Sequence, residues 1–239
     1  MKRSNPRTEK PIQERRESGQ DRRSSPKTEK SIKVMLIDDH PIVRDGYARL
    51  LDNTPDIQVV VQASNGETGC ELYPSSRPDV VILDLSMPGI GGLETLRRIR
   101  AKEPSARVLV FTMHDSETLI LRAMEAGAAG YLSKQSGVGQ MVEAVRLVAQ
   151  GKLYIDPEYV PDLIRQRIKP AEPLLTLSPR EFQLFQLLAE GHSVNEIAEI
   201  LSISPKTVGV HHTNIMKKLD VQNSAQLARL AIRHGVIQA

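Results

Sequence analysis

The chain has 239 residues, a formal net charge of +3 and about 40% hydrophobic residues, enough for one or two domains with a sizeable core. Its single cysteine, Cys70, excludes an intramolecular disulfide framework and a zinc site built on cysteines. No apolar run approaches the roughly 20 residues of a membrane span, and the start of the chain has no apolar secretory segment, so we expect a soluble, cytoplasmic protein. With no Trp, five Tyr and three Phe, an aromatic platform for single-stranded nucleic acid is disfavoured.

Residues 1–31 are predicted to be a disordered basic tail. Residues 1–32 hold ten Lys and Arg against five Asp and Glu, with only Ile12 and Ile32 as large aliphatic side chains. Such a segment buries too little apolar surface to offset its ordering entropy. Its arginine pairs could contact DNA phosphates, although a solvated tail is the favoured interpretation.

From residue 32 to residue 150, short apolar runs alternate with amphipathic stretches of helical period. Five such repeats predict a doubly wound (βα)5 domain of the α/β class, in which helices cover both faces of a parallel sheet. The expected strands are Val34–Ile37, Ile57–Val61, Val80–Leu83, Val108–Phe111 and Gly130–Leu132.

Residues 151–170 are proline-rich and are expected to be a linker, followed by an all-α unit over residues 171–239. Ser178 and Ser193 each stand three residues before a glutamate, the spacing of a capping box, and Ser204 precedes a proline that suits the first turn of a helix. The expected helices are Pro179–Ala189, Val194–Leu201, Pro205–Leu219 and Ser224–His234.

Polar side chains gather where the predicted strands of the first domain end. Asp38 and Asp39 follow the first strand, Asp84 follows the third, and Thr112 and Lys134 end the fourth and fifth. In an open α/β sheet these ends line the functional crevice. Clustered carboxylates repel unless a cation relieves them, and oxygen-only ligands without His or Cys favour a hard ion such as Mg²⁺.

A carboxylate beside Mg²⁺ can act as a nucleophile toward a phosphoryl group and form an aspartyl phosphate. Asp84 is the best candidate for this role, because its strand lies between those that carry the other groups. Lys134 and the Thr112 hydroxyl would neutralise charge on the phosphoryl oxygens.

Together with Tyr131 and the sequence Leu83-Asp84-Leu85-Ser86-Met87-Pro88-Gly89, these residues resemble the receiver domain of two-component response regulators. The resemblance implies that Asp84 accepts a phosphoryl group from a sensor histidine kinase. It implies that Asp39 binds Mg²⁺ directly, that Asp38 acts nearby or through water, and that the Ser86 backbone carbonyl is a further ligand.

Thr112 and Tyr131 would be the switch pair, although a packing role competes for Tyr131. Gln135 departs from the proline that often follows the lysine, which puts the geometry of the next loop in question.

Other residues near this site have simpler explanations. His40 and His114 are expected to have local packing or loop roles rather than to tune the lifetime of the phosphate. Cys70 is expected to be a small buried hydrophobe. The glycines after the third strand lack the spacing of a dinucleotide fingerprint.

In the helical unit, two short helices joined by a tight turn predict a helix-turn-helix motif from Val194 to Thr213, whose second helix enters the major groove. His211 is expected to pack inside, and His211-His212 lacks the spacing of metal ligands. The outward side chains that would contact DNA are Lys206, Thr207, Gly209, Val210, Thr213, Asn214 and Lys217.

Residues 171–236, including Leu177-Ser178-Pro179-Arg180-Glu181 and Lys206-Thr207-Val208, resemble the LuxR-type DNA-binding domain. Gly209 and His212 depart from the larger or basic residues common there. Residues 174–239 hold six basic and five acidic residues, so we expect weak DNA binding by the monomer and a need for dimerisation. The resemblance makes Ser224–His234 the candidate dimer contact.

The whole chain therefore resembles a NarL/FixJ-type response regulator. We predict a phosphorylation-controlled transcription regulator rather than an enzyme, with a sensor histidine kinase and double-stranded DNA as partners, Mg²⁺ as cofactor, and a homodimer when phosphorylated. A dehalogenase-like phosphatase would require a second acid where Ser86 stands. A receiver gated by a ligand or protein contact without phosphorylation is the other alternative, and autoinducer sensing does not fit an α/β domain.

Overall fold

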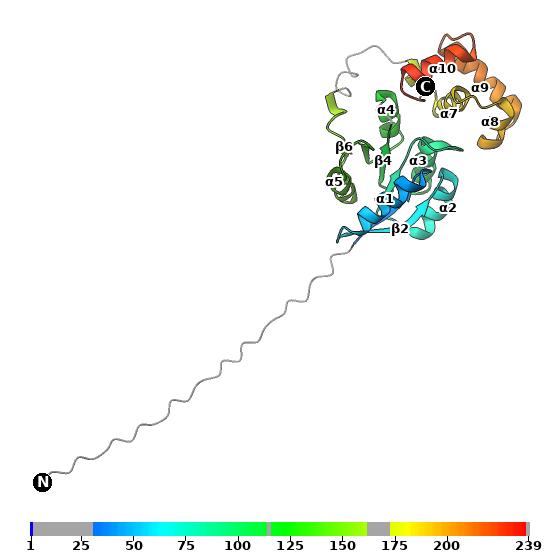
Figure 1. The fold of residues 1–239 in the computed structure, drawn as a ribbon. Helices are drawn as coiled ribbons and strands as arrows, with labels where there is room; N and C mark the ends of the chain where they lie inside the picture. Colours follow the sequence, from blue (N-terminus) through cyan, green and yellow to red (C-terminus); the bar gives the residue numbers. More distant parts are fainter. Residues whose placement is uncertain (2–30, 114–115, 162–172, 238–239) are drawn as a thin grey trace.

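The structure, a computed structural model, describes residues 1, 31–113, 116–161 and 173–237 (Figure 1). Most of the predicted basic tail (2–30), His114 and the linker residues from 162 onward lie outside this described part. An α/β unit (residues 32–161) precedes a helical unit (residues 173–237).

The α/β unit is built on a parallel sheet that has six strands in the described residues, in the order β2-β1-β3-β4-β5-β6. Near-continuous apolar strands are typical of a sheet buried on both faces. All residues of β3, β4 and β5 are buried, as are the last four residues of β1. The strands are β1 (Ile32–Ile37), β2 (Ile57–Ala63), β3 (Val80–Leu83), β4 (Val108–Thr112), β5 (Gly130–Ser133) and β6 (Tyr154–Ile155).

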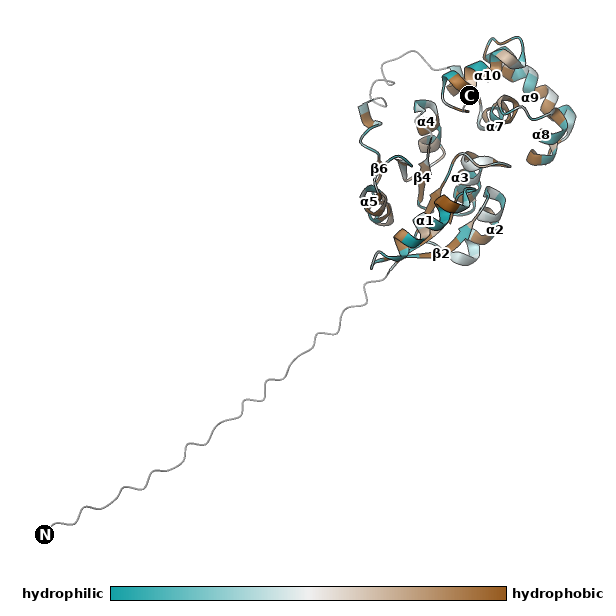
Figure 2. Cartoon of the chain, in the orientation of Figure 1, coloured by the Kyte–Doolittle hydropathy of each residue, from teal (hydrophilic) through white to brown (hydrophobic). Residues whose placement is uncertain are grey.

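Helices cover both faces of this sheet, which confirms the doubly wound α/β class. One apolar cluster joins α1 and α5 to the sheet, and a second joins α2, α3 and α4 to its opposite face. Figure 2 shows hydrophobic and hydrophilic stretches alternating along these helices, as expected for helices with one buried side. The helices are α1 (Pro41–Asp52), α2 (Gly66–Ser76), α3 (Gly91–Lys102), α4 (Glu117–Glu125) and α5 (Val138–Ala149).

Strand β6 corrects the expectation of five strands followed directly by a linker. Tyr154 and Ile155 lie within the predicted linker (151–170), yet they pair in parallel with Gly130 and Tyr131 of β5. Two residues followed closely by Pro157 are too short to show a strand period. Tyr154 and Ile155 form a strand because the open edge of β5 offers unpaired backbone N–H and C=O groups for hydrogen bonding.

The helical unit follows the sequence prediction closely. Ser178 and Glu181 form the predicted capping box at the start of α7, and Ser193 and Glu196 form the second one at α8. Ser204 caps α9 by accepting a hydrogen bond from the Thr207 amide over 3.0 Å. The elements are η1 (Pro173–Thr176), α7 (Pro179–Ala189), α8 (Val194–Leu201), α9 (Pro205–Lys218) and α10 (Ser224–Arg233).

The two units pack against each other along α3 and α4 (Figure 1). Arg122 of α4 is buried, donates hydrogen bonds to the carbonyls of Leu174 and Leu177, and lies 3.9 Å from the centre of the Phe182 ring. The Gln183 side chain of α7 donates to the Ile90 carbonyl over 3.0 Å. The apolar cluster of α3 and α4 continues into the helical unit, so the core is continuous across the contact.

Candidate functional site

Three carboxylates meet at the carboxyl ends of β1 and β3. These strands are neighbours in the sheet, while the connections that follow them run to opposite sides, which makes this edge the topological switch point. Asp38 and Asp84 are each 2% exposed, and the Asp39 side chain is about one quarter exposed. Sequence order and strand pairing therefore suffice to bring the three side chains together.

Lys134 joins two of these carboxylates. Its ammonium nitrogen lies 2.6 Å from Asp38 Oδ2 and 2.6 Å from Asp84 Oδ2, and the lysine side chain is only 6% exposed. Burial alone would lower the pKa of Lys134, but the two carboxylates outweigh it and raise that pKa above its ordinary value. The lysine is therefore a fixed positive charge at the end of β5, next to Asp84.

Short loops after the strands hold the carboxylates in place. The His40 amide donates to Asp38 Oδ1 over 2.8 Å, and the Ser86 amide donates to Asp84 Oδ1 over 3.1 Å. His40 Nδ1 lies 2.9 Å from Asp39 Oδ1, so this exposed histidine contacts the acidic group rather than packing elsewhere.

The acidic group has the composition of a site for a hard cation. One ligand atom from each of Asp38, Asp39, His40 and Asp84 lies within 4.8 Å of the others. Asp39 Oδ1 is buried and, among the groups that the structure describes, receives no hydrogen bond of good geometry. A buried acceptor without a donor is costly unless a cation or water meets it, and carboxylate oxygens are the donors that Mg²⁺ prefers. These residues fit Mg²⁺.

Thr112 and Tyr131 both lie inside the protein. Thr112 ends β4, is fully buried, and has its hydroxyl 3.4 Å from that of Ser86. Tyr131 on β5 is also fully buried, and its ring meets the edge of Tyr159 at 5.8 Å between centres. Thr112 therefore lies beside the acidic group, and Tyr131 occupies an inward position within the apolar core.

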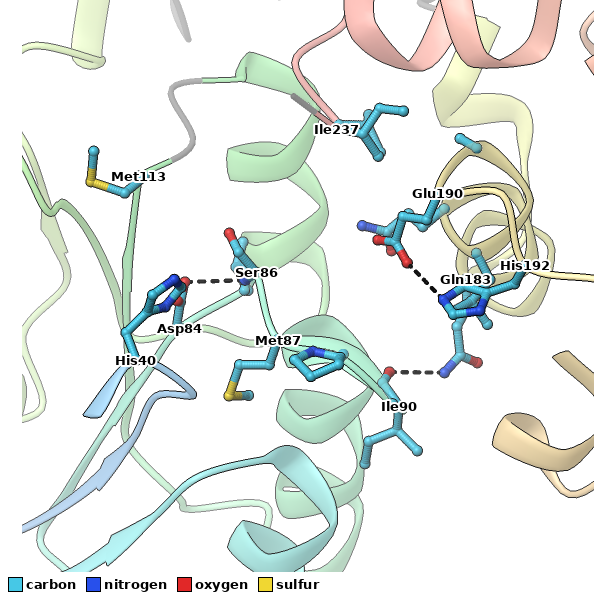
Figure 3. A pocket seen from close by; sticks show the side chains of 18 of the residues that line it. His40, Asp84, Ser86, Met87, Ile90, Met113, Gln183, Glu190, His192 and Ile237 are labelled. Atoms are coloured by element: carbon cyan, nitrogen blue, oxygen red, sulfur yellow. Dashed lines mark hydrogen bonds and ion pairs between the residues drawn. The ribbon is translucent and has the colours of Figure 1, made fainter. Parts of the chain in front are cut away.

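A cavity of about 710 Å³ connects the acidic group with the helical unit. Its lining from the α/β unit includes Asp84, Met87 and Lys134. Across the cavity lie Gln183 and Glu190, and Figure 3 shows them on the side opposite His40 and Asp84. The acidic site therefore opens onto the contact between the two units.

In the helical unit, α8 and α9 form two packed helices joined by a turn at Ser202, which adopts a left-handed conformation. Val208 and Ile215 are buried, and His211 is half-buried on the same side. On α8, Ile197 and Leu201 are buried, whereas Val194 at the start of the helix is 38% exposed. Of the predicted DNA-contacting residues, Gly209 is half-buried, and the exposed ones are Lys206, Thr207, Val210, Thr213, Asn214 and Lys217.

Three polar side chains have partners far away in the chain that the sequence did not reveal. Arg122 bonds with residues 52 and 55 positions away, and Asp156 is a buried carboxylate on the segment expected to be a linker. Glu181 was predicted as a cap, but it also lies 2.7 Å from Lys218 of α9. No periodic pattern marks such long-range partners.

Comparison with known proteins decides the family. The family model "Response regulator receiver domain" matches residues 34–146, and the model of bacterial regulatory proteins of the luxR family matches residues 175–231. The response regulator GacA of Pseudomonas aeruginosa is 40% identical over 211 residues, covering 87% of this chain and 99% of GacA. The chain belongs to the NarL/FixJ family of response regulators.

This response regulator is also similar to UvrY of Escherichia coli K12, with 39% identity over 87% of this chain and 97% of UvrY. Among solved structures, RcsB of Salmonella typhimurium matches with a TM-score of 0.68 and 28% identity, covering 84% of this chain and 96% of RcsB. Another RcsB structure, bound to the rprA promoter in the presence of the phosphomimetic BeF3⁻, matches with a TM-score of 0.67, 28% identity, and coverage of 84% of this chain and 98% of that one. The response regulator is thus a two-component regulator with a receiver and a LuxR-type DNA-binding domain. Within its described part, every helix is too short or too polar to cross a bilayer.

Proposed function

We propose that Asp84 is the phosphoacceptor of this response regulator and that a sensor histidine kinase supplies the phosphoryl group. The supporting observation is the Lys134 ammonium, held 2.6 Å from both Asp84 and Asp38 at the mouth of the sheet. A positive charge fixed there can meet the oxygens of a phosphoryl group as it reaches Asp84, without reorganising during transfer.

In the transfer, an oxygen of the Asp84 carboxylate attacks phosphorus while the bond from phosphorus to the donor breaks. The donor nitrogen of the kinase phosphohistidine keeps the bonding electron pair, and an acyl phosphate forms on Asp84. Lys134 and the Thr112 hydroxyl would then hold the phosphoryl oxygens.

Asp38, Asp39, Asp84 and the Ser86 backbone carbonyl would hold Mg²⁺ at this site. Bound Mg²⁺ supplies charge neutralisation for the carboxylates and for the incoming phosphoryl oxygens. The buried Asp39 Oδ1 supports this assignment, because it receives no hydrogen bond of good geometry from the described residues although His40 Nδ1 lies 2.9 Å away.

Phosphorylation would shift the equilibrium between two arrangements of the chain, with Thr112 and Tyr131 as switch residues. The acidic site opens into the cavity that the helical unit lines, so a change of charge and position at Asp84 and Thr112 can alter that contact. We expect the helical unit to be released, or to dimerise on paired DNA half-sites with α10 as the candidate dimer contact, in the cytoplasm. The exposed face of α9 would enter the major groove, with Lys206 and Lys217 facing phosphates or bases.

The proposal is tested with Asp84→Asn, acetyl phosphate and Mg²⁺. Wild type should gain one covalent, hydroxylamine-labile phosphoryl group and bind DNA more tightly, whereas Asp84→Asn should gain neither, because an amide is not a competent nucleophile. Asp45→Asn, which alters an exposed carboxylate on α1, is the matched control and should behave as wild type.

Labelling of Asp84→Asn at the wild-type level would refute the assignment of the nucleophile. Regulated DNA binding without any labelling of wild type would support a receiver controlled by a ligand or protein contact. Steady turnover of small phosphomonoesters would favour a phosphatase.

A further inference from the structure

Asp156 is a buried carboxylate with no role in the function described above. It follows β6, is 2% exposed, and lies 20 residues or more beyond the loop that carries Lys134. Burying a carboxylate is strongly unfavourable unless hydrogen bonds compensate for its lost hydration. The groups that donate hydrogen bonds to the Asp156 carboxylate therefore show which part of the structure it holds in place.

Two of these donors flank Lys134 in the chain. Asp156 Oδ2 accepts a hydrogen bond from the Ser136 hydroxyl and lies 3.4 Å from the Ser133 amide nitrogen. The Ser133 hydroxyl in turn accepts from the Gln135 amide over 3.1 Å. One buried oxygen thus contacts the residues before and after the Lys134–Gln135 pair.

The loop needs such a support because Gln135 stands where many receivers have proline. Proline would fix one backbone torsion of this loop, whereas glutamine leaves it free. Two backbone hydrogen bonds restrain the loop: the Lys134 amide donates to the Thr112 carbonyl over 2.8 Å, and the Ser136 amide donates to the Ser133 carbonyl over 3.1 Å. Hydrogen bonds from side chains outside the loop are therefore more important for fixing the conformation of this loop.

Asp156 is itself firmly anchored. Its amide donates to the Tyr131 carbonyl over 2.9 Å, and its Oδ1 accepts from the Glu158 amide over 3.2 Å. The same turn brings Tyr159 against Tyr131, where both rings are buried. The carboxylate is thus attached to the sheet edge and can restrain the loop.

We propose that Asp156 is a positioning residue for phosphoryl capture: by holding Ser133 and Ser136, it places the Lys134 ammonium beside Asp84. This inference rests on the proposed role of Lys134 as a ligand of the phosphoryl oxygens. It assigns to the segment after β6 a part in the chemistry at the carboxyl end of β5, where Lys134 lies. A displacement of about 1 Å of a charged group can reduce a transfer rate by about 10²-fold.

The test measures the affinity of the full-length protein for beryllofluoride in the presence of Mg²⁺, and the rate of phosphorylation by acetyl phosphate. Asp156→Ala should weaken beryllofluoride binding and slow phosphorylation by about tenfold or more. Asp156→Asn retains an acceptor oxygen for Ser133 and Ser136 and should recover most of the loss. Glu158→Ala removes a neighbouring exposed carboxylate and should match wild type.

A double-mutant cycle separates positioning from general stability. In a Lys134→Ala background, Asp156→Ala should cause no further loss, because no ammonium is left to position. Equal losses in both backgrounds would overturn the inference, as would wild-type behaviour of Asp156→Ala. If Asp156→Ala folds poorly, Ser136→Ala replaces it in the test, because this variant removes only one donor to Asp156. Ser136→Ala should lose part of the beryllofluoride affinity while its melting temperature stays unchanged. If Lys134→Ala itself binds beryllofluoride as wild type does, the proposed function of Lys134 fails as well.

Discussion

Glu181 has two roles that act through one carboxylate. It closes the capping box at the start of α7 by accepting from the Ser178 amide over 2.7 Å, and it lies 2.7 Å from the Lys218 ammonium of α9. Burial opposes its ionisation, but the hydrogen bonds from Lys218 and Ser178 outweigh burial and lower the pKa of Glu181 to about 2. The ionised carboxylate thereby ties α7 to the helix proposed to read DNA.

If this ion pair stabilises the fold, Glu181→Gln should lower the free energy of unfolding by an amount that depends on pH. The folded pKa is about 2 against an ordinary value of 4.5, so the stabilisation is complete above pH 4.5 and is lost as the pH falls toward 2. Glutamine can still close the capping box. Denaturant unfolding should therefore show a loss of about 1.5–3 kcal/mol at pH 7, the range for hydrogen bonds to charged groups, and this loss should disappear near pH 2.

Glu196→Gln is the matched control, because Glu196 closes the same kind of box at α8 without a lysine partner among the described contacts. It should change the free energy of unfolding much less than Glu181→Gln. Equal and pH-independent effects of the two variants would contradict an ion pair between α7 and α9.

Helix α9 contains a glycine, Gly209, within the proposed DNA-binding surface. Gly209 adopts no positive φ, and a Cβ placed there would meet no atom within 4 Å. The residue therefore costs helix stability without any packing requirement in the free protein. Its place between Lys206 and Val210 suggests that the missing side chain matters when DNA is bound.

Gly209→Ala should raise the free energy of unfolding by about 0.5–1 kcal/mol, since alanine loses less backbone entropy on folding. Gly46→Ala in α1 has equally open space and should give a similar gain. Only Gly209→Ala should alter the affinity for DNA, measured by titration at fixed salt concentration. If both variants bind DNA as wild type does, Gly209 is not at the DNA surface.

At the scale of the whole molecule, the two units share an apolar core, and Arg122 stands at their boundary. The exposed side chains of α9 lie away from this boundary, so docking of the units leaves the proposed DNA-reading face uncovered. The proposed homodimer on DNA would therefore use a face of α9 that is already exposed in the docked arrangement.

Arg122→Met should uncouple the two units. It leaves the Leu174 and Leu177 carbonyls without their donor and removes the contact with Phe182, a loss of about 2–4 kcal/mol. Calorimetry should show one cooperative transition for wild type and two for the variant. Arg229→Met, at an exposed site on α10, is the control. A single transition at the wild-type temperature would show that Arg122 does not join the units.

Local patterns were enough to predict most of this architecture. Apolar runs of strand length predict a parallel sheet, and the carboxyl ends of parallel strands lie at one edge, so the sequence alone places Asp38, Asp84 and Lys134 together. Ser178 and Ser193 likewise mark helix starts, because a capping box is complete within four residues.

Only the tertiary structure reveals the contacts that depend on distant partners. Two residues of β6 become a strand because β5 offers an open edge, Asp156 becomes buried because Ser133 and Ser136 receive it, and Arg122 is buried against a unit more than 50 positions away. Local sequence determines periodicity and caps, which require only near neighbours. The burial of a polar residue depends on which surfaces meet after folding, and no local pattern records that.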